Sequence, residues 1–181
     1  MDPDLRRRAA AIRLLLLDAD GVLTDGVVLN IPAAAPGTAF ETKGFHSQDG
    51  IALQWLVQRG VQTGLISGRV SQAVEIRARQ LGMAYLYQGR LEKLPVLDEI
   101  AGRSGLPLTS IAYAGDDLPD LPIMRRVGLA FAPSNARAEV KKAAHYVTEA
   151  SGGHGAVREM VELLMQAGGT WAEILKNYEA D

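Results

Sequence analysis

Three aspartates follow a short apolar run near the beginning of the chain, in the segment "LLLLDADGVLTDG". Four consecutive leucines are too few for a helical pattern and do not alternate with polar residues, so they predict a strand buried on both faces of a parallel sheet. Open α/β sheets bind ligands at the carboxyl ends of their strands, where Asp18 and Asp20 would lie, with Asp25 a little further on. Because neighbouring carboxylates repel one another unless a cation or a proton offsets their charge, the segment predicts a cation site.

Further polar residues follow later apolar runs. Ser67, Gly68 and Arg69 come directly after one such run, Asp116 comes shortly after the run "IAYA", and Lys93 lies near the start of a predicted helix. A helix N-terminus disfavours a cation, so Lys93 predicts an anion close by. Each residue alone has an ordinary explanation as a helix cap, a turn residue or a surface lysine. Together they fall at one edge of the predicted sheet, which favours a shared site.

Phosphoryl transfer uses this set of groups. A carboxylate such as Asp18 can attack phosphorus and form an aspartyl phosphate, while a second acid such as Asp20 protonates the leaving oxygen and later activates water. Magnesium prefers hard oxygen ligands, which suits Asp18, the backbone carbonyl of Asp20, and Asp116. Ser67 and Lys93 would hold the remaining phosphate oxygens, where charge grows in the transition state. These residues predict a magnesium-dependent catalytic site.

Length and composition favour a single domain that comprises residues 1–181, because 48% hydrophobic residues suffice for a normal core. The formal net charge of -2 gives no reason to expect nucleic acid as a partner, and the cluster Arg6–Arg8 is expected to be a solvated arm. The chain has no cysteine, which excludes disulfides, thiolate nucleophiles and cysteine-bound metals. No apolar run approaches the roughly 20 residues of a membrane span, and Arg13 interrupts the N-terminal run, unlike a signal peptide. We therefore expect a cytoplasmic protein with no membrane partner.

Apolar runs of strand length alternate with amphipathic stretches, and glycine or proline stands at the joints, which is typical of βα repeats. The predicted strands are Arg13–Leu17, Gln62–Ile66, Tyr85–Tyr87, Ile111–Ala114, Leu129–Phe131 and His145–Val147. The predicted helices are Asp49–Arg59, Ser71–Leu81, Glu92–Ser104, Ala136–Ala143, Ala156–Gln166 and Thr170–Tyr178. Gly60, Gly82 and Gly105 follow three of these helices, as left-handed C-caps do. Short βα connections cross over with a right hand, so we expect an α/β fold, a Rossmann-like parallel sheet with helices on both faces.

One segment breaks this alternation. Two β-prone runs, Val27–Asn30 and Ala39–Phe45, are joined by a turn rich in proline, alanine and glycine, and they predict a β-hairpin inserted after the acidic loop. Its position over the carboxyl end of the first strand suits a flap that excludes water from the site. An ordinary surface excursion is the alternative.

The succession of "DADGVLTDG", "ISGR", Lys93 and "GDDLPD" resembles the haloacid dehalogenase superfamily of aspartate-nucleophile phosphatases, in order and spacing, across almost the whole chain. The resemblance implies a capless architecture with Mg²⁺ as cofactor, in which Asp18 is the nucleophile and a metal ligand. Asp20 is then the acid/base that also offers its carbonyl to the metal, and Asp116 is the third ligand. The other residues with an implied role, at the phosphate or around the metal ligands, are Ser67, Lys93, Asp117 and Asp120.

The segments "YQG", "GDDLPDLPIM" and "GGHGAVRE" narrow the resemblance to superfamily members that act on a phosphorylated 2-keto sugar acid in lipopolysaccharide synthesis. Arg69 and Arg77 match positions that meet the sugar acid in that group, and a guanidinium pairs with a carboxylate through two parallel hydrogen bonds. The residues expected to bind the substrate are Asp20, His46, Ser47, Gln48, Asp49, Gly50, Gly68, Arg69, Arg77, Lys93 and Arg158. The resemblance also implies a homotetramer in which the glycine-rich stretch at Gly152, Gly153 and Gly155 lies near an active-site entrance.

Alternatives remain for the substrate and for the class of protein. Gln48 and Gln54 stand where that group commonly has basic residues, so another 2-keto sugar acid phosphate, of the sialic acid or KDN type, is an alternative substrate. A receiver-type signalling domain also gathers acids and a lysine at a sheet edge, but its phosphate-accepting Asp would follow the third strand, where this chain offers Gln88 or Ser67. A non-catalytic assembly module, like the phosphatase-like domains fused to sialic acid activating enzymes, would lack core motif residues, and none is missing here.

Overall fold

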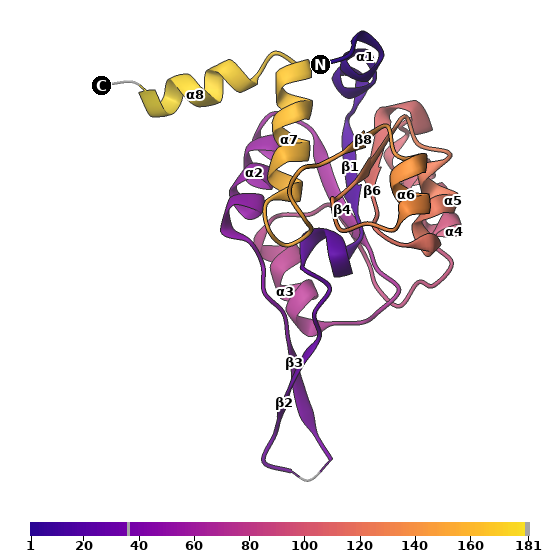
Figure 1. The fold of residues 1–181 in the computed structure, drawn as a ribbon, viewed down its shortest axis with the longest axis vertical. Helices are drawn as coiled ribbons and strands as arrows, with labels where there is room; N and C mark the ends of the chain where they lie inside the picture. Colours follow the sequence, from indigo (N-terminus) through magenta and orange to yellow (C-terminus); the bar gives the residue numbers. More distant parts are fainter. Residues whose placement is uncertain (36, 180–181) are drawn as a thin grey trace.

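A computed structural model describes residues 1–35 and 37–179 of the chain. Pro36 of the predicted hairpin turn and the last two residues of the predicted domain lie outside the described residues. The main sheet has six parallel strands in the order β5-β4-β1-β6-β7-β8 (Figure 1). In chain order these are β1 (Leu14–Leu17), β4 (Gln62–Ile66), β5 (Tyr85–Tyr87), β6 (Ile111–Ala114), β7 (Leu129–Ala132) and β8 (Tyr146–Val147). The predicted parallel sheet is confirmed, and its strand ends differ from the prediction by one residue at most.

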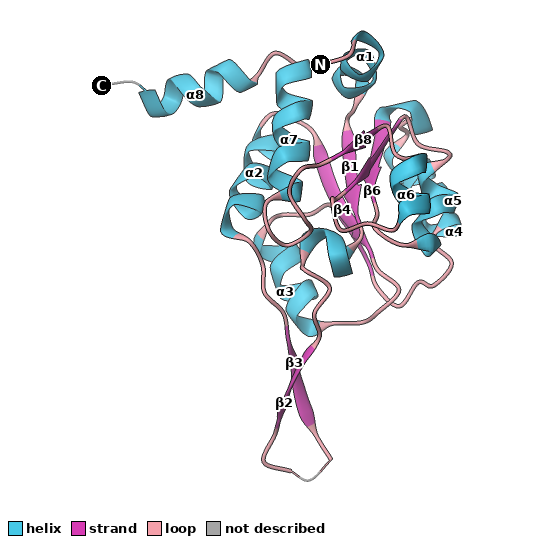
Figure 2. Ribbon diagram, in the orientation of Figure 1, coloured by secondary structure: helices cyan, strands magenta, loops and turns pink. Residues whose placement is uncertain are grey.

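Helices cover both faces of this sheet (Figure 2). Their bounds are α1 (Pro3–Ala11), α2 (Ser47–Gln58), α3 (Gln72–Gln80), α4 (Leu94–Ser104), α5 (Leu121–Met124), α6 (Ala138–Ala143), α7 (Ala156–Ala167) and α8 (Trp171–Glu179). Helices α2, α3 and α7 pack on one face and α4, α5 and α6 on the other, while α1 packs against α7. Within the described part of the chain, no helix is long and apolar enough to cross a membrane.

The four leucines of β1 are fully buried because the strand lies in the middle of the sheet and its side chains alternate between the two faces. Leu15 and Leu17 belong to the core under α2 and α7, whereas Leu14 and Leu16 belong to the core under α4 and α5. Full burial of a leucine side chain contributes about 1.5–3 kcal/mol. The unbroken apolar run is therefore explained by helices on both sides of a central strand.

Two helices are absent from the sequence prediction. Helix α1 contains the basic cluster that was expected to be a solvated arm, and that expectation is wrong in part. Asp2 caps the helix through its carboxylate, Pro3 occupies the first turn, and Arg8 donates a hydrogen bond to the Gly128 carbonyl. Helix α5 has four residues, too few to show a helical period. The predicted helices agree with the structure to within two residues at each end.

The predicted hairpin consists of β2 (Leu29–Pro32) and β3 (Ala39–Thr42), which pair antiparallel as a separate two-stranded sheet. It extends from the body at the end of the molecule opposite to both termini (Figure 1). Leu29, Ile31 and Phe40 on the hairpin are each more than half exposed. The hairpin is confirmed, although β2 begins and ends two residues later than predicted and β3 ends three residues earlier. Its action as a flap stays a prediction.

Candidate active site

Polar residues from the ends of neighbouring strands meet in one cleft. Asp18 and Asp20 follow β1, Ser67 follows β4 and Asp116 follows β6, and these three strands are adjacent at the centre of the sheet. The cleft has a volume of about 480 Å³. Its walls are formed by Asp18, Asp20, Gly26, Ser67, Gly68, Arg69, Leu91, Lys93, Asp116, Asp117, Pro119 and Asp120. The structure therefore brings the residues predicted at this edge of the sheet together in one cleft.

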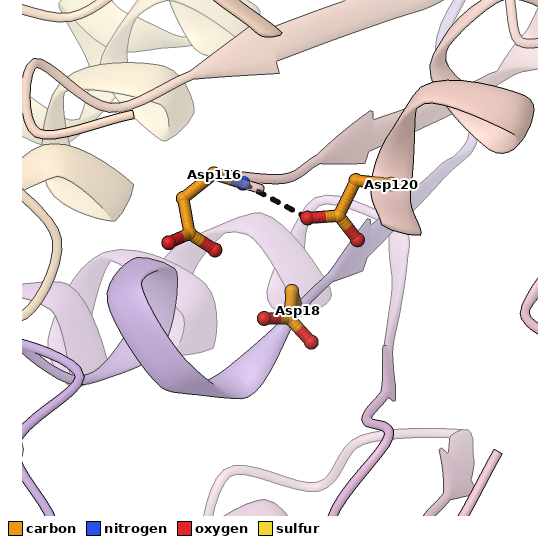
Figure 3. Close-up of side chains that lie close together, drawn as sticks. All are labelled: Asp18, Asp116 and Asp120. Atoms are coloured by element: carbon orange, nitrogen blue, oxygen red, sulfur yellow. Dashed lines mark hydrogen bonds between the residues drawn. The ribbon is translucent and has the colours of Figure 1, made fainter. Parts of the chain in front are cut away.

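Three acids gather at the floor of the cleft. Carboxylate oxygens of Asp18, Asp116 and Asp120 lie within 4.8 Å of one another (Figure 3). The loop after β1 approaches Asp116 so closely that a Cβ on Gly21 would lie 2.1 Å from Asp116 Oδ2. Gly21 also has a φ of +88°, a conformation that other residues rarely adopt. A glycine is thus required for the acidic loop to reach Asp116.

Lys93 brings positive charge to these acids. Its Nζ lies 2.6 Å from Asp18 Oδ1 and 2.7 Å from Asp120 Oδ1, so the anion predicted near this lysine is confirmed. Asp120 Oδ1 also accepts a hydrogen bond from the Tyr113 hydroxyl over 2.6 Å, and Asp120 Oδ2 accepts one from the backbone N–H of Asp116. Both oxygens of Asp120 are therefore engaged within the protein. The carboxylates of Asp18 and Asp116 lie close together (Figure 3), and Asp18 Oδ1 is paired with Lys93.

Without a bound cation, ionising the acids of this cluster costs free energy. Burial raises the pKa of Asp18 to about 6, although Lys93 opposes the rise. Burial, followed by the negative charges of Asp18 and Asp120, raises the pKa of Asp116 to about 7. Three carboxylates and one ammonium carry a net charge of -2, which one divalent cation balances. Hard carboxylate oxygens in this arrangement fit Mg²⁺.

Asp20 lies in a second charged group, of which Lys43 and Glu41 were not predicted as site residues. Lys43 Nζ is 2.5 Å from Asp20 Oδ1 and 3.8 Å from Glu41 Oε1, and the Lys43 side chain is fully buried. Arg69 Nη2 is 2.7 Å from Glu41 Oε2, and Arg69 Nε is 3.4 Å from Asp20 Oδ2. A lysine and a glutamate within a β-prone run were the only signal in the sequence.

Several residues predicted to bind the substrate do not line this cleft: His46, Ser47, Gln48, Asp49, Gly50, Arg77 and Arg158. Ser47 and Arg77 line a separate open hollow beside Phe45. The Arg77 guanidinium lies 5.8 Å from the centre of the Phe45 ring, and a Cβ on Gly50 would lie 2.1 Å from Arg77 Nη2. Within one chain Arg77 is thus packed against the start of α2, and its contact with substrate stays a prediction.

Arg158 packs against residues of its own chain. Its guanidinium lies 4.4 Å from the ring centre of Trp55, and its Nε is paired with Glu162 one helical turn away. Its backbone N–H donates to Asp49 Oδ1 over 2.8 Å, so buried Asp49 caps the first turn of α7. Asp49 and Arg158 therefore join α2 to α7 at some remove from the cleft.

The glycine-rich stretch lies against the acidic loop of its own chain. A Cβ on Gly152 would lie 1.9 Å from Gly21 O, and a Cβ on Gly153 would lie 2.3 Å from Asp25 N. Asn135 bridges the two segments, since its Nδ2 donates to Gly21 O over 3.0 Å and its Oδ1 accepts from Gly152 N over 2.7 Å. The stretch thus holds the loop that carries the first two aspartates. Its place at a neighbour's entrance stays a prediction.

Comparisons with known proteins agree with this geometry. The family model of haloacid dehalogenase-like hydrolases matches residues 66–160. The chain is 38% identical over 164 residues to the 3-deoxy-D-manno-octulosonate 8-phosphate phosphatase KdsC of Yersinia pestis, across 91% of this chain and 85% of that protein. Among solved structures it is similar to a probable YrbI-family phosphatase from Pseudomonas syringae, with a TM-score of 0.94, 43% identity and 99% of both chains covered. It is also similar to a 3-deoxy-D-manno-octulosonate 8-phosphate phosphatase from Moraxella catarrhalis in complex with magnesium ion, phosphate ion and KDO, with a TM-score of 0.93, 34% identity, and 99% and 100% of the two chains covered.

The chain belongs to the haloacid dehalogenase-like hydrolases, as its motifs predicted. Within them it is a phosphoric monoester hydrolase, similar along almost its whole length to phosphatases named for 3-deoxy-D-manno-octulosonate 8-phosphate, or KDO 8-phosphate. The receiver-type signalling domain is excluded by this membership. A non-catalytic module is disfavoured, because every core motif residue lines the cleft.

Proposed function

We propose that this protein is a magnesium-dependent phosphatase that hydrolyses KDO 8-phosphate to KDO and phosphate through an aspartyl phosphate, in lipopolysaccharide synthesis. The observation that carries the proposal is the acidic cluster, in which Asp18 lies against Lys93 and close to Asp116. The names of the curated relatives and the Moraxella complex support the choice of substrate.

In the first chemical step, an oxygen of Asp18 attacks phosphorus and the bond from phosphorus to the sugar oxygen breaks. Asp20, in the same cleft, gives a proton to that leaving oxygen. Lys93 orients the attacking carboxylate and offsets the charge on the phosphoryl oxygens. Ser67 Oγ accepts a hydrogen bond from Arg69 N over 3.2 Å, so its hydroxyl hydrogen can be donated to a phosphoryl oxygen.

In the second step, Asp20 takes a proton from water, and the water oxygen attacks phosphorus. The bond from phosphorus to Asp18 breaks, phosphate leaves, and both acids return to their starting forms. Mg²⁺ held by Asp18, Asp116 and the Asp20 carbonyl supplies Lewis-acid polarisation of the phosphoryl group. Asp120 contributes by fixing the backbone of Asp116 and the ammonium of Lys93.

Arg69 supports a substrate that carries a carboxylate. It lines the cleft, its side chain is 53% exposed, and it already pairs with the carboxylate of Glu41. KDO is a 2-keto sugar acid, whose carboxylate suits a guanidinium. Another 2-keto sugar acid phosphate, of the sialic acid or KDN type, remains the alternative, because Gln48 and Gln54 offer no positive charge.

The homotetramer and the cytoplasmic location are further parts of the proposal. A hairpin with open edges and exposed Leu29, Ile31 and Phe40 is a surface that other subunits would cover. Because Arg77 lines a separate hollow in its own chain, its proposed contact with substrate would be made in the cleft of a neighbouring subunit.

A screen of phosphorylated sugar acids with Mg²⁺, scored by release of inorganic phosphate, tests the proposal. We expect KDO 8-phosphate to be hydrolysed faster than sialic acid or KDN phosphates, and EDTA to abolish turnover. Asp18→Asn should be folded and inactive, since an amide does not attack phosphorus. Near-normal turnover by that variant would remove the nucleophile assignment, and a preference for another sugar acid would reassign the substrate.

A further inference from the structure

Lys43 is a buried lysine that none of the roles above explains. Its side chain has no exposed area, and its Nζ lies 2.5 Å from Asp20 Oδ1. A buried ammonium is costly unless an acid holds it, and here Asp20 does so, with Glu41 Oε1 3.8 Å away. One of these acids is the residue to which the proposed reaction assigns both proton transfers.

The hairpin determines where Lys43 lies. Lys43 directly follows β3, while the other arm of the hairpin continues from the acidic loop that carries Asp20. At the base of the paired strands, Leu29 is opposite Thr42. The ion pair from Lys43 to Asp20 therefore joins the end of the hairpin to the acidic loop, at the edge of the cleft.

The two oxygens of Asp20 have different surroundings. Oδ1 lies against Lys43, whose side chain is fully buried, and Oδ2 lies 3.4 Å from Nε of Arg69, which lines the cleft and is half exposed. The contact with Lys43 thus turns one oxygen toward the protein and leaves the other on the side of the cleft. Without Lys43, the remaining cation beside Asp20 is Arg69, which would draw the carboxylate into a new orientation.

We propose that Lys43 is a positioning residue that fixes the rotation of the Asp20 carboxylate, so that one oxygen reaches the leaving oxygen and later the attacking water. This inference rests on the proposed function, because it concerns the proton transfers made by Asp20. Lys43 does not line the cleft, so it acts on the reaction through Asp20. Because Lys43 directly follows β3, the orientation of the Asp20 carboxylate also depends on the position of the hairpin.

Two substrates distinguish this role from a purely structural one. The leaving oxygen of KDO 8-phosphate is an alkoxide that needs a proton, whereas 4-nitrophenolate leaves without one. Lys43→Met keeps the length of the side chain and removes its charge. Because a positioned acid or base contributes about 10²- to 10⁴-fold, we expect this variant to lose about 10- to 100-fold in kcat on KDO 8-phosphate, with little change in KM.

The same variant should behave differently on 4-nitrophenyl phosphate. Formation of the aspartyl phosphate needs no proton there and should be retained, while attack by water, which needs Asp20 as base, should slow. Rapid mixing should then show a burst of nitrophenolate that matches the number of active sites, followed by slow turnover. Lys43→Arg, which keeps a cation beside Oδ1, should restore kcat on both substrates.

Lys142→Met is the matched control. It removes an exposed lysine on α6 and should change neither substrate's kinetics. Equal losses on both substrates without a burst, accompanied by a lower melting temperature, would show that Lys43 only supports the fold and would overturn the inference. Unchanged kcat in Lys43→Met would overturn it too. If the unaltered protein released phosphate from neither ester, the proposed function itself would fail.

Discussion

Asp18 and Asp116 are acids whose ionisation the fold opposes. Their pKa values in the folded protein, about 6 and about 7, lie above the ordinary value of 3.8. Between about pH 4 and about pH 7 the folded protein therefore holds more protons than the unfolded chain. By linkage, their contribution to the free energy of unfolding falls as the pH rises through this range. A bound cation favours the ionised carboxylates and offsets this loss.

We therefore expect Mg²⁺ to raise the melting temperature more at about pH 7.5 than at about pH 5, where protons compete for the same oxygens. Thermal unfolding with Mg²⁺ and with EDTA at each pH measures the difference. Asp116→Asn should lose most of the Mg²⁺ effect, because one anionic ligand is gone. A shift of equal size at both pH values would contradict the assignment of Asp18 and Asp116 as the cation ligands.

Tyr113 supports the acidic cluster from inside the sheet. Its hydroxyl donates to Asp120 Oδ1 over 2.6 Å and accepts a hydrogen bond from Lys93 over 3.2 Å. Burial and the nearby Asp120 raise the pKa of Tyr113 well above its usual range, so the hydroxyl stays protonated. Tyr113→Phe removes one hydrogen bond to a buried carboxylate and should lower the free energy of unfolding by about 1.5–3 kcal/mol.

Urea unfolding measures this change in Tyr113→Phe. Tyr178→Phe is the matched control, because Tyr178 is 69% exposed and should change the stability by less than about 0.5 kcal/mol. Turnover of Tyr113→Phe should also fall, since Lys93 loses part of the network that orients it. Equal stability of the two variants would show that Asp120 finds another donor.

At the scale of strands and helices, the parallel sheet explains which site residues could be predicted. Asp18, Ser67 and Asp116 follow adjacent parallel strands, so topology alone brings them to one edge. Lys43 could not be predicted, because its place depends on how the two arms of the hairpin leave the sheet. Tyr113 could not be predicted either, because in an apolar strand it is indistinguishable from an ordinary core residue.

The contact of the glycine-rich stretch with the acidic loop is also testable. A Cβ on Gly152 would lie 1.9 Å from a backbone oxygen of Gly21, so Gly152→Ala must displace one segment. We expect a loss of about 1–3 kcal/mol in the free energy of unfolding, and reduced turnover because the displaced loop carries Asp18. Gly102→Ala is the control: it lies in α4 with open space around its Cβ and should stabilise by about 0.5–1 kcal/mol. Unchanged turnover in Gly152→Ala would show that the loop adapts.

At the scale of the whole molecule, the cleft and the hairpin lie at the same end. Strand β1 runs from the end that holds both termini toward the end from which the hairpin extends (Figure 1). The described residues include no second domain over the cleft, so a bound sugar acid would remain open to water except at the hairpin. The packing of one chain explains neither the exposed apolar residues of the hairpin beyond its base nor the open cleft. Both are explained if other subunits complete the site.

The last prediction therefore concerns assembly. Ile31 and Phe40 are opposite one another on the hairpin and are 54% and 68% exposed. The unaltered protein should sediment at about four times the chain mass of 19.4 kDa. A variant with Ile31→Glu and Phe40→Glu should sediment as a smaller species with the same circular dichroism, because charged side chains cannot be buried between subunits. It should lose turnover of KDO 8-phosphate far more than turnover of 4-nitrophenyl phosphate, since only the sugar acid needs contacts beyond the phosphate.

Leu175→Glu, on α8 at the opposite end of the molecule, is the control and should leave the assembly intact. A fully active monomer of the unaltered protein would overturn the shared site while leaving the chemistry assigned to Asp18 in place.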